Sequence, residues 1–94
     1  MHQTLFLDSW RVSLATNCHA NGAGATNINP NPWETNRSVD SCKIACSSLA
    51  DCEGFVFLNG NCHLRKNINK KKCLNQPGHT LYEKLDYNKG TILK

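Results

Sequence analysis

Residues 52–66 read CEGFVFLNGNCHLRK, and this stretch predicts the β-hairpin around which the rest of the fold is built. Asn59-Gly60 is a favoured pair for a two-residue type I′ turn. With that turn, four residues share one face of the hairpin: Phe55, Phe57, Cys62 and Leu64. The other face carries Val56, Leu58, His63 and Arg65. Because this second face is half polar, we expect the first face to be packed and the second to be partly exposed to water.

A short amphipathic helix is predicted just before the hairpin, in RSVDSCKIACSSLADC at residues 37–52. Ser38 can cap its first turn, and Asp40 lies near the positive end of the helix dipole. Cys42 and Cys46 are four residues apart, so both side chains leave the same face of the helix. We expect that face to pack against the hairpin.

Two further strands are predicted near the ends of the chain. In WRVSL, residues 10–14, apolar and polar residues alternate, so that Trp10, Val12 and Leu14 share one face. TLYEKL, residues 80–85, has the same kind of pattern. An antiparallel sheet with one helix packed across it is therefore expected, which is a small α+β fold.

The remaining segments set the domain organisation. Residues 17–32 are rich in Asn, Gly and Pro and predict a long loop that Cys18 holds in place. A chain of 94 residues forms one domain by size, with an ordered core at about residues 10–86 and a tail at residues 87–94. Such a chain buries only about 60–65% of its unfolded surface, so its hydrophobic core is marginal.

Six cysteines offer covalent support for this small core: Cys18, Cys42, Cys46, Cys52, Cys62 and Cys73. An even number without CxxC pairs fits a disulfide framework better than a zinc site, and it indicates an oxidising compartment. Cys52 and Cys62 cannot bond to each other, because the hairpin separates them by about 16 Å, beyond the ~7 Å limit between Cα atoms. Each therefore needs a helix cysteine, and Cys52 takes the nearer one. Of the fifteen connectivities the favoured one is Cys46–Cys52, Cys42–Cys62 and Cys18–Cys73.

The spacing C-x3-C on a helix, then C-x-G-F-x-F, a turn and C-x-L-x-K resembles the PAN/apple domain. The matching residues are Cys42, Cys46, Cys52, Gly54, Phe55, Phe57, Cys62, Leu64 and Lys66. The resemblance implies a helix stapled to the middle of an antiparallel sheet, with the same two helix–hairpin disulfides. It also implies a non-catalytic extracellular module that binds proteins or carbohydrates, as in adhesins, growth-factor-like proteins and protease precursors.

The third cysteine pair departs from one branch of that family. Apple domains of clotting proenzymes join cysteines near the two domain ends, whereas Cys18 follows the first predicted strand and Cys73 precedes the last. The chain therefore resembles the broader PAN group, and its third bond is expected to join two loops. We expect one module of a larger secreted or surface protein. The alternatives are a free-standing secreted effector or inhibitor and a structural spacer.

A basic cluster is the first candidate ligand site: Arg65, Lys66, Lys70, Lys71 and Lys72. Without these five residues the formal net charge of +4 would be −1. The cluster favours an anionic partner, such as a sulfated glycan or an acidic protein, and some PAN modules bind heparin through a basic ridge. The alternative is a solvated loop. Nucleic acid is not expected, because no aromatic residues alternate with the cations.

Trp33 and Asn36 are further candidates. Trp33 lies between prolines and glutamate in NPNPWE, where it could contact a ligand or cover a loop. Asn36-Arg37-Ser38 is a possible glycosylation site. His19, His63 and His79 lack the spacing of metal ligands, so neither a metal nor another cofactor is expected.

The sequence carries no sign of an enzyme or a membrane protein. It has no G-x-S-x-G elbow, and six paired cysteines leave no thiol for catalysis. No apolar run approaches the ~18 residues of a membrane span, so membrane insertion is not expected.

Overall fold

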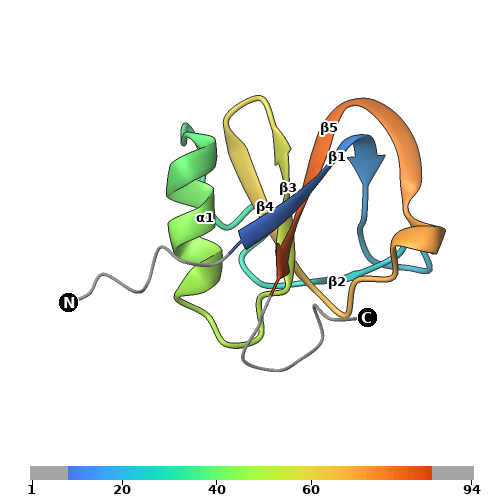
Figure 1. The fold of residues 1–94 in the computed structure, drawn as a ribbon, viewed down its shortest axis with the longest axis horizontal. Coiled ribbons are helices and arrows are strands. Elements are labelled where there is room, and N and C mark those ends of the chain that lie inside the picture. Colours follow the sequence, from blue (N-terminus) through green and yellow to red (C-terminus); the bar gives the residue numbers. More distant parts are fainter. Residues whose placement is uncertain (1–8, 86–94) are drawn as a thin grey trace.

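The computed structural model describes residues 9–85, which form a five-stranded antiparallel sheet with one α-helix packed across it (Figure 1). The elements are β1 (Ser9–Asn17), β2 (Thr26–Asn27), α1 (Val39–Ser47), β3 (Gly54–Leu58), β4 (Asn61–Lys66), a 3₁₀ turn (Lys70–Lys72) and β5 (Leu74–Leu85). The order across the sheet is β1-β5-β3-β4-β2. This is the disulfide-rich α+β architecture that the sequence predicts.

The hairpin of β3 and β4 has the predicted register. Asn59 and Gly60 both have positive φ, at 50° and 82°, as a type I′ turn requires. Phe57 pairs with Cys62, and Phe55 pairs with Leu64. On its other side β3 pairs with β5. The hairpin therefore forms the centre of the sheet, and its two faces belong to two different environments.

The helix covers one of these faces. Its N-cap is Ser38, whose Oγ accepts a hydrogen bond from the backbone N–H of Ser41 at 3.1 Å. Cys42 and Cys46 are fully buried and point toward the hairpin, where they bond to Cys62 and Cys52. The helix and both disulfides agree with the sequence prediction. We call this side of the sheet the helix face.

Phe55 is the centre of the core on the helix face. Its ring stacks on Tyr82 of β5 at 4.8 Å between centroids and meets Trp10 of β1 edge-on at 5.5 Å. Phe55 and Leu64 are fully buried, and the helix cysteines pack against them. Four strands and the helix thus share one apolar cluster.

The outer strands differ in part from the prediction. β1 contains the predicted residues 10–14 and has Trp10 against the core, but Val12 and Leu14 are 51% and 77% exposed. The reason is position, because β1 pairs with β5 at the edge of the sheet. β5 includes the predicted strand at residues 80–85 and begins earlier, at Leu74. The predicted tail at residues 87–94 lies outside the described residues.

The third disulfide joins Cys18 to Cys73, as the sequence favours. Asn17 and Leu74 form the last residue pair between β1 and β5, and the two cysteines are their direct neighbours. The bond therefore joins a residue directly after β1 to one directly before β5, both outside the strands, as the sequence predicts.

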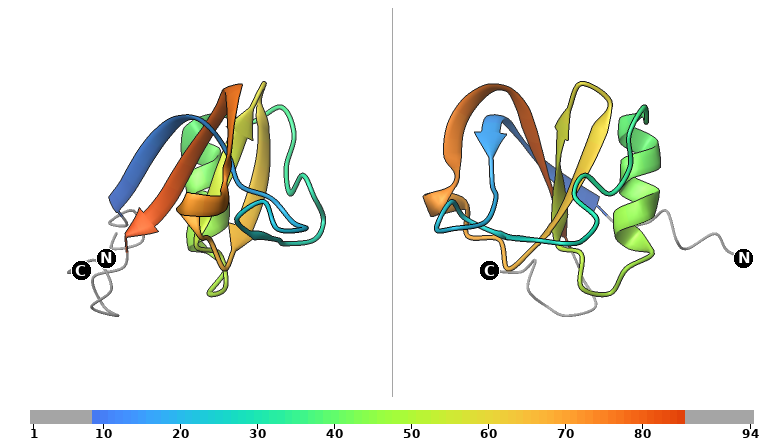
Figure 2. Two further views of the ribbon diagram at one scale, coloured as in Figure 1. Left: turned by 90° about the vertical axis from the view of Figure 1, so that its right-hand side faces the viewer. Right: turned by 180° about the vertical axis from the view of Figure 1, so that it is seen from behind.

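The long segment after Cys18 first passes beside the 3₁₀ turn that precedes β5. It then follows the edge of β4 and ends at the start of α1 (Figure 2). It contains the short strand β2, which pairs with β4. Farther along, the backbone N–H of Ile28 donates to the carbonyl of Leu64 at 3.1 Å, and that of Trp33 donates to Cys62 at 2.7 Å. These bonds fix the segment against the sheet. We call the side of the sheet that carries Val56 and Arg65 the loop face.

Candidate functional site

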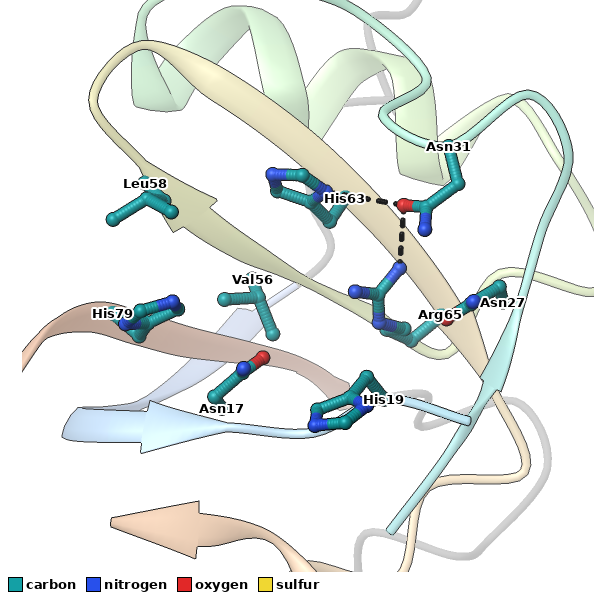
Figure 3. Close-up of a pocket in the computed structure, with 9 residues that line it drawn as sticks. All are labelled: Asn17, His19, Asn27, Asn31, Val56, Leu58, His63, Arg65 and His79. Carbon is teal, nitrogen blue, oxygen red and sulfur yellow. Dashed lines mark hydrogen bonds between the residues drawn. The ribbon is translucent and has the colours of Figure 1, made fainter. Parts of the chain in front are cut away.

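A cavity of about 280 Å³ lies on the loop face (Figure 3). The four residues that the hairpin pattern assigns to its partly wet face all line it: Val56, Leu58, His63 and Arg65. The other lining residues are Asn17, His19, Asn27, Asn31 and His79. Two apolar side chains are thus surrounded by three asparagines, three histidines and one arginine.

Segments far apart in the sequence build this cavity. Asn17 and His19 flank the disulfide-bonded Cys18 at the end of β1, and Asn31 comes from the loop that follows β2. His79 comes from β5, next to Gly78, whose φ of +86° turns the strand. Because Cys18 is bonded to Cys73, the segments carrying Asn17, His19 and β5 are held together covalently. The cavity is therefore a preformed part of the fold.

Arg65 is the most unusual residue of the cavity, because it is charged and only 4% exposed. Its Nε donates to the carbonyl of Cys18 at 2.5 Å, and its Nη1 donates to Oδ1 of Asn31 at 2.8 Å. Among residues 9–85, no carboxylate pairs with Arg65 and no group accepts a hydrogen bond from its Nη2. Buried charges in proteins are normally paired. This guanidinium therefore has its amide and carbonyl contacts but lacks a counter-ion within the described chain.

The charge on Arg65 persists at neutral pH. Burial lowers the pKa of Arg65 to about 10, which is still far above pH 7. The pKa of His63 is also lowered, first by burial and then by the positive charges of Arg65 and His79. At neutral pH the cavity therefore holds one fixed positive charge, on Arg65, beside a neutral imidazole at His63.

The hydrogen bonds around Asn31 fix the proton on His63. Arginine can only donate, so the atom of Asn31 that faces Nη1 of Arg65 must be the amide oxygen. The same oxygen lies 3.1 Å from Nδ1 of His63, which must then carry the proton and donate it. In the neutral ring Nε2 is left as an acceptor, and it is buried without a partner among the described residues. Figure 3 shows Asn31 between the two side chains that it links.

A second lining atom has unused hydrogen-bonding capacity. Oδ1 of Asn27 is buried and has no partner within residues 9–85. Buried polar atoms are nearly always satisfied by protein or solvent, and an unsatisfied one costs about 1–3 kcal/mol. The walls of the cavity therefore contain two buried acceptors that no described residue satisfies, Oδ1 of Asn27 and Nε2 of His63, besides the charged donor Nη2 of Arg65.

The predicted basic cluster is divided in the structure. Lys70, Lys71 and Lys72 form the exposed 3₁₀ turn. Lys66 follows Arg65 on β4, and successive strand residues point to opposite faces, so these two cations do not share a surface. The structure thus brings together the three consecutive lysines, which we call the lysine turn, and places Arg65 in the cavity.

Trp33 and Asn36 lie outside the cavity. Trp33 is partly buried and packs against the core of the helix face, so it covers the hairpin near Cys62. Asn36 is exposed and has a φ of +56°. Neither residue lies beside the lysine turn or lines the cavity.

Several cavity residues were not predicted as ligand contacts. The sequence indicates His19, His63 and His79 only as residues to test for metal binding. In the described part of the chain, no group of three or more His, Cys, Asp or Glu side chains is placed to hold a metal ion. The signal that could have indicated the site was the alternation in β4, which sets His63 and Arg65 on the same face as Val56. The asparagines gave no such signal, because their segment has no periodic pattern.

No family model, curated protein sequence or solved structure matches this chain. Within residues 9–85, no helix is long and apolar enough to cross a membrane. The three disulfides, which use all six cysteines, fit an oxidising compartment.

Proposed function

We propose that this chain is a non-catalytic binding module of the PAN/apple type, within a secreted or cell-surface protein, that recognises a protein or carbohydrate through the cavity on the loop face. The observation that carries the proposal is the buried guanidinium of Arg65, which has no carboxylate partner within the described chain. A purely structural arginine would be expected to have a counter-ion, since an uncompensated buried charge is destabilising.

Two further features support a binding module. The helix is stapled to the central hairpin by Cys42–Cys62 and Cys46–Cys52, the arrangement that the PAN/apple resemblance implies. The cavity volume of about 280 Å³ is close to the ~300 Å³ at which small-molecule sites begin. It would accept one sugar unit or one side chain of a protein partner.

Other functions have weaker support. Catalysis by cysteine would need a free thiol, and all six cysteines are in disulfides. A structural spacer would have no reason to keep an uncompensated arginine inside a cavity. An effector or inhibitor differs from an adhesion module in its partner, and both would use the same binding surface.

A glycan array and an array of extracellular proteins would test this function. Besides the parent, we would use His79→Trp, which fills the cavity, and Ile44→Trp, which adds the same ring to an exposed position of α1. We expect the parent and Ile44→Trp to bind the same ligand and His79→Trp to lose it. A parent that binds nothing on either array would indicate a spacer, and equal binding by all three proteins would exclude the cavity.

A further inference from the structure

We propose that the cavity binds the carboxylate group of an acidic sugar, and that Arg65 is the residue that receives this carboxylate. The inference rests on the proposed binding function and adds the chemical class of the ligand.

The first step is the charge of the cavity. Arg65 brings one positive charge, and no carboxylate among residues 9–85 neutralises it. Figure 3 shows the guanidinium beside the interior that Val56, His63 and His19 enclose. Since Nε and Nη1 already donate to Cys18 and Asn31, Nη2 is the nitrogen available to a ligand oxygen. A hydrogen bond between two charged groups is about twice as strong as a neutral one.

The second step is the number of charges that the ligand carries. One arginine beside a neutral His63 provides for a single negative charge. A phosphate with two charges would be left partly uncompensated, and a sulfate ester presents three oxygens where one charged nitrogen is free. A carboxylate has one charge and two oxygens, so it fits the available donor most closely.

The third step is the rest of the ligand. The rest of the lining is mostly polar, with three asparagines and three histidines whose side chains can exchange hydrogen bonds with sugar hydroxyls. Leu58 provides an apolar surface for the C–H face of a sugar ring. A volume of about 280 Å³ suits one such ring. A carboxylate, several hydroxyls and a small apolar face occur together in uronic and sialic acids.

The probes are methyl glycosides of glucuronic, galacturonic and N-acetylneuraminic acid. Each uronide is paired with its neutral counterpart, the glucoside or the galactoside, and glucose 6-sulfate and acetate complete the set. Binding is followed on the whole, isotope-labelled protein by NMR, with the Nε–H signal of Arg65 and the ring signals of His63 as reporters. We expect at least one acidic glycoside to shift these signals and to bind at least tenfold more tightly than its neutral counterpart, as a charge-assisted bond implies.

Asn31→Asp is the most specific variant. It places a carboxylate on the atom that already faces Nη1 of Arg65, so the protein supplies its own counter-ion. We expect the acidic glycoside to lose at least tenfold in affinity. The matched control is Asn59→Asp, which changes the net charge equally at an exposed turn where Asp-Gly is as suitable as Asn-Gly. A second control changes Lys70, Lys71 and Lys72 to Gln, and both controls should bind as the parent does.

The outcomes separate this inference from the proposed function. Equal shifts from acidic and neutral glycosides would overturn the carboxylate assignment and leave a carbohydrate-binding cavity. A preference for glucose 6-sulfate, or for acetate alone, would also overturn the assignment, since the first lacks the carboxylate and the second lacks the sugar. If no probe shifts the cavity signals, the acidic sugar is excluded, whatever the arrays show. The glycoside comparison needs no variant, so it decides the question even if Asn31→Asp fails to fold.

Discussion

Successive side chains of β3 and β4 point to opposite faces of the central hairpin, and the two faces are packed in different ways. On the helix face, Phe55 and Leu64 are fully buried under α1 and two disulfides. On the loop face, Val56 and Arg65 lie under a segment with little regular structure. A cavity remains between this segment and the hairpin. Close packing maximises burial and leaves no room for a ligand, whereas a loop-covered polar face can keep unused donors and acceptors. The helix face thus carries the larger apolar cluster, whereas the loop face combines a smaller cluster of Cys18, Val56 and Leu81 with the cavity.

The largest expected difference between the faces comes from neighbouring residues of β3. Phe55→Ala should cost about 3–5 kcal/mol of unfolding free energy, because the ring is in contact with Trp10 and Tyr82 in a closed core. Val56→Ala should cost about 2 kcal/mol, because only two methyl groups are lost from the smaller cluster with Cys18 and Leu81. Urea unfolding measures both values. Equal costs would show that the loop face is as tightly packed as the helix face.

The next effect concerns the staples of the helix face. Replacing Cys42 and Cys62 with Ala should cost about 3 kcal/mol, since this bond spans 20 residues. Replacing Cys46 and Cys52 should cost less, about 2 kcal/mol, because the bond spans 6 residues. The first loss is a large part of the stability of a small domain, which is about 5–15 kcal/mol. Thermal unfolding followed by circular dichroism tests this order, and a transition unchanged within a few degrees in the Cys42 and Cys62 variant would contradict it.

These differences explain which parts could be predicted from the sequence. The hairpin register follows from Asn59-Gly60, and two disulfides follow from the helical spacing of Cys42 and Cys46, because short-range geometry leaves few alternatives. The third pairing follows by elimination. All three depend on interactions between residues that are near in the sequence or on the limited reach of a disulfide.

The cavity depends on long-range placement and was not predicted as a site. Arg65 was assigned to the basic cluster by its charge, although the alternation of β4 separates it from Lys66. Asn31 and His79 come to Arg65 only after β5 and the loop have been placed in the fold. The exposure of Val12 and Leu14 has the same origin, since no local pattern shows that β1 lies at the sheet edge.

A smaller effect on the loop face concerns how the unfolding free energy depends on pH. The pKa of His63 in the folded protein lies below the usual 6.5, so below that pH the unfolded chain binds more protons at this residue. The stability contributed by His63 is therefore present above pH 6.5 and is lost as the pH falls through the folded-state pKa. His63→Gln can still donate to Asn31 and does not titrate. We expect the unfolding free energy of the variant to fall less than that of the parent between pH 7.5 and 5, and parallel curves would contradict the burial of this imidazole.

The smallest expected effect on stability, with a clear effect on binding, is at the lysine turn. Changing Lys70, Lys71 and Lys72 to Gln should leave the unfolding free energy almost unchanged, because exposed charges contribute about 0–1 kcal/mol even when paired. If the lysine turn binds sulfated glycans, the parent should remain on a heparin column to higher salt than this variant. The attraction acts over a Debye length of ~8 Å at physiological salt, so retention should decrease steeply as salt is raised.

Asn31→Asp is the matched control on the same column, because it neutralises the buried cation and leaves the exposed ones in place. Retention that depends on the lysines and not on Asn31 would mean that the lysine turn binds extended sulfated chains without the cavity. If the lysine variant elutes with the parent and Asn31→Asp elutes earlier, the buried arginine alone accounts for anion binding and the lysine turn is a solvated surface. If all three proteins elute together near physiological salt, neither set of cations binds heparin. Removing or compensating a cation that contributes to retention must lower the retention.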